Sequence, residues 1–157
     1  MEARDRLALA LDVDDLVEAV RLARLLRPWF GIAKVGLELF SAAGPEAIGA
    51  MRSLGYSVFC DVKLHDIPNT VRGAARVLGS IGVDLLTLHA AGGEVMLRAG
   101  VEGLTEGAEA AGLPAPRALA VTILTSEGRR PPALLDERVA PRTVLGMSWS
   151  LTSQNTE

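Results

Sequence analysis

The sequence has few aromatic residues and no excess of basic charge. Aromatic side chains make up 4% of the 157 residues while 49% are hydrophobic, so the core must be built from leucine, alanine, valine and glycine. This composition is typical of alternating strands and helices rather than of a β-sandwich. The net charge of -3 provides no field for gathering nucleic acid. We therefore expect one α/β domain of ordinary size without a nucleic-acid partner.

Long hydrophobic runs and paired cysteines are also missing. No charge-free apolar run approaches the roughly 20 residues of a membrane helix, and charged residues at positions 4 to 6 interrupt the N-terminus before a signal-peptide core could form. The single cysteine, Cys60, has no partner for an internal disulfide. Its place in an apolar strand predicts a buried structural thiol. These features indicate a soluble, cytoplasmic protein that has no membrane partner.

Short apolar runs alternate with helical patterns along the chain. Because each predicted strand is followed by a helix or a short loop, right-handed crossovers and a parallel sheet are expected. The predicted strands cover residues 7–11, 31–36, 57–63, 83–89 and 118–123. The predicted helices run from residue 16 to before Pro28, from Pro45 to Gly55, from Pro68 through Ile81, and over 94–111.

Parallel sheets of this kind form either an open doubly wound sheet or a (β/α)8 barrel. A glycine-rich phosphate turn is lacking after the first strand, where Asp12-Val13-Asp14-Asp15 stands instead, which disfavours a dinucleotide-binding sheet. A barrel assembles its active site from the carboxyl ends of successive strands. The pattern predicts a TIM-barrel fold, here incomplete, with five recognisable β/α units. The polar residues at the strand ends are Asp12, Lys34, Asp61, Lys63, His89, Thr122 and Thr125.

The segment from Asp61 to Thr70 concentrates charge directly after an apolar strand. Asp61 and Lys63 share a strand face and lie about 6.5 Å apart along it, close enough to pair, and Asp66 adds a second carboxylate near the same lysine. Solvated strand-end charges are the simpler interpretation, but Asp12 and Lys34 on the neighbouring strands favour a site. Such an array suits a lysine that is held protonated and delivers a proton to a developing carbanion.

These residues resemble a known family. The motif Asp61-x-Lys63-x-x-Asp66-Ile67-Pro68-Asn69-Thr70 is similar to that of the orotidine 5'-phosphate decarboxylases. The Asp-x-Lys-x-x-Asp core is shared with sugar-phosphate decarboxylases and synthases, whereas the Ile-Pro-Asn-Thr continuation is specific to the orotidylate enzymes. The resemblance covers about residues 5 to 128, through the stretches Leu9-Ala10-Leu11-Asp12, Lys34-Val35-Gly36, Thr87-Leu88-His89-Ala90, Gly92-Gly93 and 121–126.

The resemblance implies decarboxylation of orotidine 5'-phosphate to UMP in pyrimidine biosynthesis, without a cofactor or a metal ion. Lys63 would donate the proton to C6 of the pyrimidine, and Lys34, Asp61 and Asp66 would complete the charged array. Asp12 and Lys34 would also meet the ribose hydroxyls of the substrate. Asp61 would contact the substrate as well, and Thr125 would lie near the pyrimidine ring.

The resemblance also implies a homodimer with shared active sites. The residues that match Asp66, Ile67 and Thr70 reach into the partner's site in this family. His65 and His89 inherit no chemical role, and we interpret both as structural histidines at a loop and a strand end.

The last thirty residues depart from the family pattern. We divide the chain into residues 1–128, the N-terminal portion of a barrel with the catalytic motif, and 129–157, a loop and an atypical tail without a recognisable strand. A barrel needs about 250 residues, and Arg142 and Gln154 match no phosphate-binding motif after a last strand. A truncation or a reading-frame change near residues 130–147 is one hypothesis. One alternative is an impaired barrel that acts only as a dimerising fragment. Another is a metal-dependent sugar-phosphate decarboxylase or aldolase, which Ile67-Pro68-Asn69-Thr70 disfavours and magnesium-dependent activity would favour.

Overall fold

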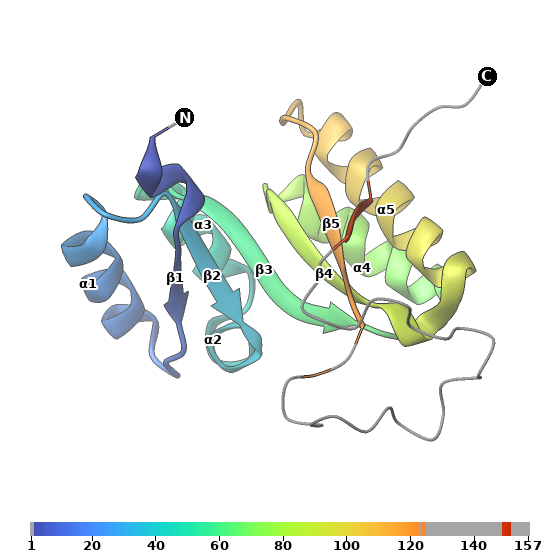
Figure 1. The fold of residues 1–157 in the computed structure, drawn as a ribbon, viewed down its shortest axis with the longest axis horizontal. Helices are drawn as coiled ribbons and strands as arrows, with labels where there is room; N and C mark the ends of the chain where they lie inside the picture. The colour runs from blue at the N-terminus through green and yellow to red at the C-terminus, as the bar shows by residue number, and fades with distance from the viewer. Residues whose placement is uncertain (1, 123, 125–148, 152–157) are drawn as a thin grey trace.

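A computed structural model describes residues 2–122, 124 and 149–151 (Figure 1). These residues form a sheet in the order β1-β2-β3-β4-β5-β6. Its first five strands run parallel to their neighbours, and β6 is antiparallel to β5. The strands are β1 (Ala8–Leu11), β2 (Ile32–Gly36), β3 (Ser57–Leu64), β4 (Leu85–His89), β5 (Arg117–Val121) and β6 (Trp149–Leu151).

Helices connect the parallel strands, and their ends follow local sequence signals. The Asp15 side chain accepts a hydrogen bond from the Glu18 amide at 2.7 Å and caps the first helix. Pro45 and Pro68 occupy first helical positions, where a missing amide proton costs nothing. The helices are η1 (Ala3–Arg6), α1 (Leu16–Leu26), α2 (Leu37–Ala43), α3 (Pro45–Ser53), α4 (Pro68–Ser80), η2 (Ala90–Gly92) and α5 (Gly93–Ala110).

The order of the strands distinguishes between the two parallel folds. Strands β1 to β5 lie in the sheet in the order in which they occur in the sequence, without the reversal that marks a doubly wound sheet. Figure 1 shows them as a curved arc with helices along one side. This arrangement confirms the predicted TIM-barrel family architecture, with five strands of the arc present among the described residues.

The two faces of the arc differ in burial. Side chains alternate along β1, β3 and β5 between buried and more exposed positions. On the helix-covered face Leu11, Val35, Val58 and Cys60 are completely buried and join one continuous core. The opposite face is only partly covered within the described residues, and it carries the polar side chains of the strand ends. The helix-covered face of the sheet therefore forms the core, and the opposite face presents the polar side chains of the strand ends.

Helices α4 and α5 touch through their backbones. A Cβ atom added at Gly103 would lie 2.2 Å from the Arg72 carbonyl oxygen, and one at Gly107 would lie 1.9 Å from that of Arg76. Such distances leave no room for a side chain, so glycine is required at both positions. An ion pair between Arg72 and Glu106 also joins the two helices. This close contact fixes the start of α4, directly after the charged segment, against the neighbouring β/α unit.

The sequence predicted the five parallel strands and four of the helices within a few residues. Four elements were not predicted, and two of them are the short helices η1 and η2. Helix α2 follows β2 directly, and strand β6 contradicts the expectation of a tail without a strand at residues 149–151. The proposed boundary between residues 128 and 129, and most of the tail, lie outside the described residues.

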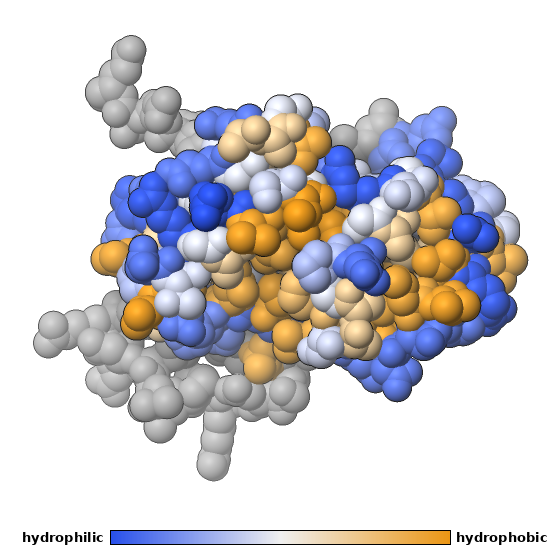
Figure 2. All heavy atoms as spheres, turned by 180° about the vertical axis from the view of Figure 1, so that it is seen from behind, coloured by the Kyte–Doolittle hydropathy of each residue, from blue (hydrophilic) through white to orange (hydrophobic). Residues whose placement is uncertain are grey.

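Apolar side chains also reach the surface. Figure 2 shows them in patches among charged side chains on the side opposite to the view of Figure 1. No helix in the described part of the chain is long and apolar enough to cross a membrane. The large apolar residues that are about half or more exposed are Leu7, Val17, Leu25, Trp29, Leu37, Ile67, Val77 and Val95.

Candidate active site

Charged side chains gather at the carboxyl ends of the first three strands. Asp12 follows β1, Lys34 lies within β2, and Asp61 and Lys63 lie in the second half of β3. Because these strands are parallel, their carboxyl ends meet at the same edge of the sheet. The register places Gly36 at the end of β2 opposite Asp61. Four of the predicted site residues are thus brought to one edge.

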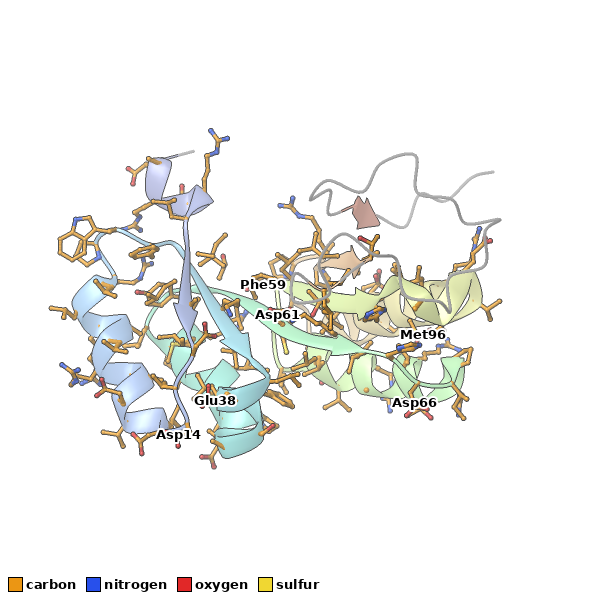
Figure 3. All side chains as sticks on the ribbon, turned by 60° about the horizontal axis from the view of Figure 1, so that its bottom comes forward. Asp14, Glu38, Phe59, Asp61, Asp66 and Met96 are labelled. Carbon is orange, nitrogen blue, oxygen red and sulfur yellow. The ribbon has the colours of Figure 1, made fainter. Side chains whose placement is uncertain are left out.

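Asp61 and Lys63 form a direct ion pair. The Lys63 Nζ atom donates to Asp61 Oδ1 at 2.9 Å, and the two side chains are 29% and 17% exposed. Figure 3 shows Asp61 near the middle of the long strand β3. Partial burial weakens solvent screening, so the two charges attract each other more strongly than those of a fully exposed pair would. The predicted proximity of these two residues is confirmed.

The backbone of Lys63 departs from the regular strand. Its φ angle is 50°, the only positive value at a non-glycine residue among those described, and the β3–β4 register shifts between Cys60 and Leu64. A left-handed conformation costs a non-glycine residue about 1–2 kcal/mol. Regular alternation, which predicted a common face for Asp61 and Lys63, therefore holds up to Asp61, and the backbone departs from it at Lys63. Strain of this kind marks positions where a side chain is re-aimed.

A second ion pair lies on the neighbouring strands. Lys34 Nζ donates to Asp12 Oδ1 at 2.8 Å, with the Lys34 side chain 22% exposed and that of Asp12 63% exposed. Both atoms lie over Gly36, since a Cβ atom there would be 3.4 Å from the carboxylate oxygen and 3.7 Å from the amine. Because Gly36 is opposite Asp61, two Asp–Lys pairs stand on adjacent strands of one edge.

Asp66 does not join either pair. Its Oδ1 atom accepts a hydrogen bond from the Ile67 amide at 2.6 Å, and it forms no ion pair with any residue that the structure describes. Figure 3 shows Asp66 near the start of α4, away from Asp61. Asp66, Ile67 and Thr70 are all exposed, Ile67 by 68%. Thr125, the remaining predicted site residue, lies outside the described residues.

The two histidines stack on each other beside this loop. The rings of His65 and His89 lie 5.1 Å apart at an angle of 16°, and His89 Nδ1 accepts from the Ala91 amide at 3.2 Å. They stand next to a hollow of about 600 Å³. Within the described residues, no three histidine, cysteine or acidic side chains lie close enough together to hold a metal ion. The hollow is lined by His65, Asp66, Ile67, Pro68, Ala91 and Gly92.

Thr87 is a site residue that the sequence did not single out. It is the one polar residue that is fully buried among those described, at 2% exposure in the middle of β4. Its Oγ1 atom accepts from the Lys63 amide at 2.9 Å and lies 3.1 Å from Asp61 Oδ1. The sequence signal that could have identified Thr87 is a hydroxyl residue between Leu86 and Leu88, in the predicted strand that follows the Asp61–Thr70 motif.

Cys60 precedes the ion pair but faces the core. The side chain is completely buried and forms no disulfide, as predicted. Burial, with a smaller contribution from the negative charge of Asp61, raises the pKa of the thiol to about 12. The thiol therefore stays protonated and is a poor nucleophile.

A sequentially ordered parallel arc that carries charged side chains at its strand ends defines a protein of the β/α-barrel class. Comparison with known families refines this class. Residues 5–138 match the family described as "Orotidine 5'-phosphate decarboxylase / HUMPS family". The chain belongs to this family, which confirms the resemblance seen in the motif.

Curated relatives carry the name orotidine 5'-phosphate decarboxylase. The protein from Moorella thermoacetica is 51% identical over 129 residues, which are 82% of this chain and 51% of the relative. The protein from Nitratidesulfovibrio vulgaris strain DP4 is 47% identical over 152 residues, with 92% and 63% covered. The chain thus spans about half to two thirds of the length of these relatives.

Solved structures also resemble this chain over part of their length. The orotidine 5'-phosphate decarboxylase of Lactobacillus acidophilus superimposes with a TM-score of 0.66 at 40% identity, covering 78% of this chain and 55% of that one. A conserved protein from Geobacillus kaustophilus, described as uncharacterized, gives a TM-score of 0.70 at 43% identity, with 76% and 55% covered.

Proposed function

We propose that the chain decarboxylates orotidine 5'-phosphate to UMP, with Lys63 as the proton donor. The observation that carries this proposal is the half-buried Asp61–Lys63 pair, held at a strained backbone position at the carboxyl end of β3. The family match and the names of the relatives supply the substrate. The proposed setting is the cytoplasm.

The proposed reaction needs no group beyond the side chains. The bond between C6 and the carboxylate carbon breaks, carbon dioxide leaves, and the bonding electron pair stays on C6. The Lys63 ammonium then transfers a proton to C6, and water returns a proton to the amine. Asp61 holds the ammonium group in place through their ion pair, and its charge opposes the substrate carboxylate before the reaction more than it opposes the departing neutral carbon dioxide.

The second ion pair has a binding role in this proposal. Lys34 lies on β2, the strand next to that of the reacting lysine, and Asp12 follows β1, one strand further away. Together they present an ammonium and a carboxylate that can hold ribose hydroxyls. Since the Asp12 side chain is 63% exposed, it remains accessible to a substrate. Thr125 would complete the site near the pyrimidine ring.

The decisive assay measures the conversion of orotidine 5'-phosphate to UMP by the purified chain, without added metal, from the change in pyrimidine absorbance. Lys63→Ala should lower kcat by at least about 100-fold, the usual contribution of a positioned proton donor. Arg98→Ala removes an exposed cation that pairs with Glu94 on α5 and serves as the matched control. Absence of turnover by the unmodified chain, or activity that requires magnesium, would contradict the proposal.

We also propose that two copies share their active sites. Asp66, Ile67 and Thr70 are exposed on the loop and first turn after β3, and Asp66 has no cationic partner among the described residues. These are the features expected of residues that complete the site of a second copy.

Mixing two inactive variants tests the shared sites. If Asp66 acts across the interface, a mixture of Lys63→Ala and Asp66→Ala chains regains activity, because a mixed dimer contains one site with both native residues. Sedimentation should show dimers in each sample. A mixture that dimerises but stays as inactive as its components would refute the sharing of Asp66.

A further inference from the structure

Thr87 connects the two features that make Lys63 unusual. Lys63 has a left-handed backbone, and its amine is paired with Asp61. One hydroxyl, Thr87 Oγ1, lies within hydrogen-bond distance of the Lys63 amide at 2.9 Å and of Asp61 Oδ1 at 3.1 Å. The hydroxyl therefore contacts both the backbone and the counter-ion of the same lysine.

The chemistry of a hydroxyl fits both contacts at once. A threonine hydroxyl has one proton to donate and two lone pairs that accept. The Lys63 amide can only donate, so the hydroxyl accepts there. The hydroxyl proton is then left for the Asp61 carboxylate, since the alternative acceptor, the Cys60 carbonyl oxygen, is more distant at 3.5 Å. Asp61 Oδ1 thus receives hydrogen bonds from Thr87 and from the Lys63 amine.

The register between β3 and β4 explains why the Lys63 amide needs the Thr87 hydroxyl as an acceptor. The register between β3 and β4 shifts between Cys60 and Leu64, so the Lys63 amide has left the regular ladder and needs another acceptor. Thr87 is 2% exposed, which removes water as a substitute. Because β4 is fixed between β3 and β5, the hydroxyl is held at a defined place.

We infer that Thr87 is a positioning residue for the proton donor: its hydroxyl fixes the left-handed backbone of Lys63 and orients the Asp61 carboxylate that holds the amine. This inference rests on the proposed function for its catalytic consequence, and on geometry alone for its structural part. Loss of the hydroxyl leaves the Lys63 amide unpaired and frees Asp61 to rotate. The amine then spends less time at the position from which it reaches C6.

Two variants of Thr87 distinguish the effect of the hydroxyl group from the effect of side-chain shape. Thr87→Val keeps the branched shape and removes the hydroxyl, whereas Thr87→Ser keeps the hydroxyl and loses a methyl group. In the active chain, Thr87→Val should lower kcat by roughly 10- to 100-fold with little change in KM, as expected for a displaced reacting group. Thr87→Ser should stay within about threefold of the unmodified chain. Equal kcat values for Thr87→Val and the unmodified chain, or equal losses in both variants, would overturn the inference.

Amide hydrogen exchange tests the structural part independently of activity. The Lys63 amide should exchange faster in Thr87→Val and remain protected in Thr87→Ser. The Val58 amide in the same strand donates to Asp84 Oδ2 at 2.7 Å and serves as the internal reference for overall stability. If the unmodified chain is inactive but these exchange rates follow the hydroxyl, the proposed function fails while the positioning of Lys63 stands. Undiminished protection of the Lys63 amide in Thr87→Val would refute the positioning itself.

Discussion

At the scale of single residues, Lys63 combines a strained backbone with a half-buried charge. Its φ angle of 50° is a conformation that glycine adopts freely and lysine does not. The ion pair with Asp61 and the hydrogen bond that the Lys63 amide donates to the Thr87 hydroxyl stabilise this conformation. The left-handed backbone therefore lowers the stability of the folded chain and at the same time places the Lys63 amine. Such strain is common at functional sites.

The strain at residue 63 can be measured with two variants that both lack the amine. Lys63→Gly and Lys63→Ala remove the same ion pair, but only alanine retains a Cβ atom that conflicts with the left-handed backbone. We expect the glycine variant to be more stable by about 0.5–1 kcal/mol in urea unfolding, after its larger entropy in the unfolded chain is included. A more stable alanine variant would show that residue 63 is not left-handed.

The buried thiol of Cys60 predicts a pH dependence of stability. Its ordinary pKa of 9.0 is raised to about 12 in the folded protein, so above pH 9 the unfolded chain releases a proton that the folded chain keeps. The unfolded state then binds fewer protons, and the free energy of unfolding falls as pH rises. The stabilisation is complete below about pH 9 and is lost toward about pH 12.

The expected loss is about 1 kcal/mol between about pH 8 and about pH 10. Urea unfolding at the two pH values measures it. Cys60→Ala lowers stability at both pH values by leaving a small cavity, but this variant should lack the thiol's share of the pH-dependent loss. An identical pH dependence in the variant would show that the thiol is not responsible.

Much of the candidate site could be predicted from individual residues of the sequence. Asp61 and Lys63 were recognised from their strand-end position and spacing, and the structure pairs them as expected. The left-handed backbone of Lys63 could not be anticipated, because lysine disfavours it and the register shift depends on β4. Thr87 was missed because its role also depends on contacts between two strands. It contacts residues that lie 24 and 26 positions away in the sequence.

At the scale of elements, the contact between α4 and α5 holds the site loop in place. Glycines at the interface allow the two backbones to touch, and α4 begins directly after the loop that carries Asp66. The packing of these helices therefore determines where the residues proposed to reach a second copy are presented.

Two glycine substitutions should have opposite effects on stability. Gly103→Ala would place a Cβ atom 2.2 Å from the Arg72 carbonyl oxygen and force the helices apart, so we expect a loss of about 3 kcal/mol. Gly73→Ala in α4 meets nothing within 4 Å and should stabilise the helix by about 0.5–1 kcal/mol. Thermal or urea unfolding measures both variants. Similar effects at the two positions would contradict the close helix contact.

Elements were predicted well where their signals are local. Alternation of apolar runs with helical patterns located the five parallel strands, and prolines marked two helix starts. Helix α2 was missed because it is only seven residues long, follows β2 at Gly36 and has no side-chain cap. Strand β6 was missed because its antiparallel pairing with β5 joins residues about thirty positions apart.

At the scale of the whole molecule, the strand order and the strand-end charges agree with the family. The parallel arc brings Asp12, Lys34, Asp61 and Lys63 to one edge, from three different strands. The matched relatives are longer, since this chain covers 51% and 63% of two of them. The part of the barrel that the described residues form therefore includes the edge that carries Lys63.

Chemical rescue of Lys63→Ala tests whether the Lys63 amine is the proton donor. The purified variant is assayed for release of carbon dioxide and formation of UMP, with and without small alkylammonium ions in the buffer. We expect a loss of at least about 100-fold in kcat relative to the unmodified chain and a partial recovery that rises with the ammonium concentration. Decarboxylation by Lys63→Ala at the unmodified rate, without any added amine, would contradict the assignment of Lys63 as the proton donor.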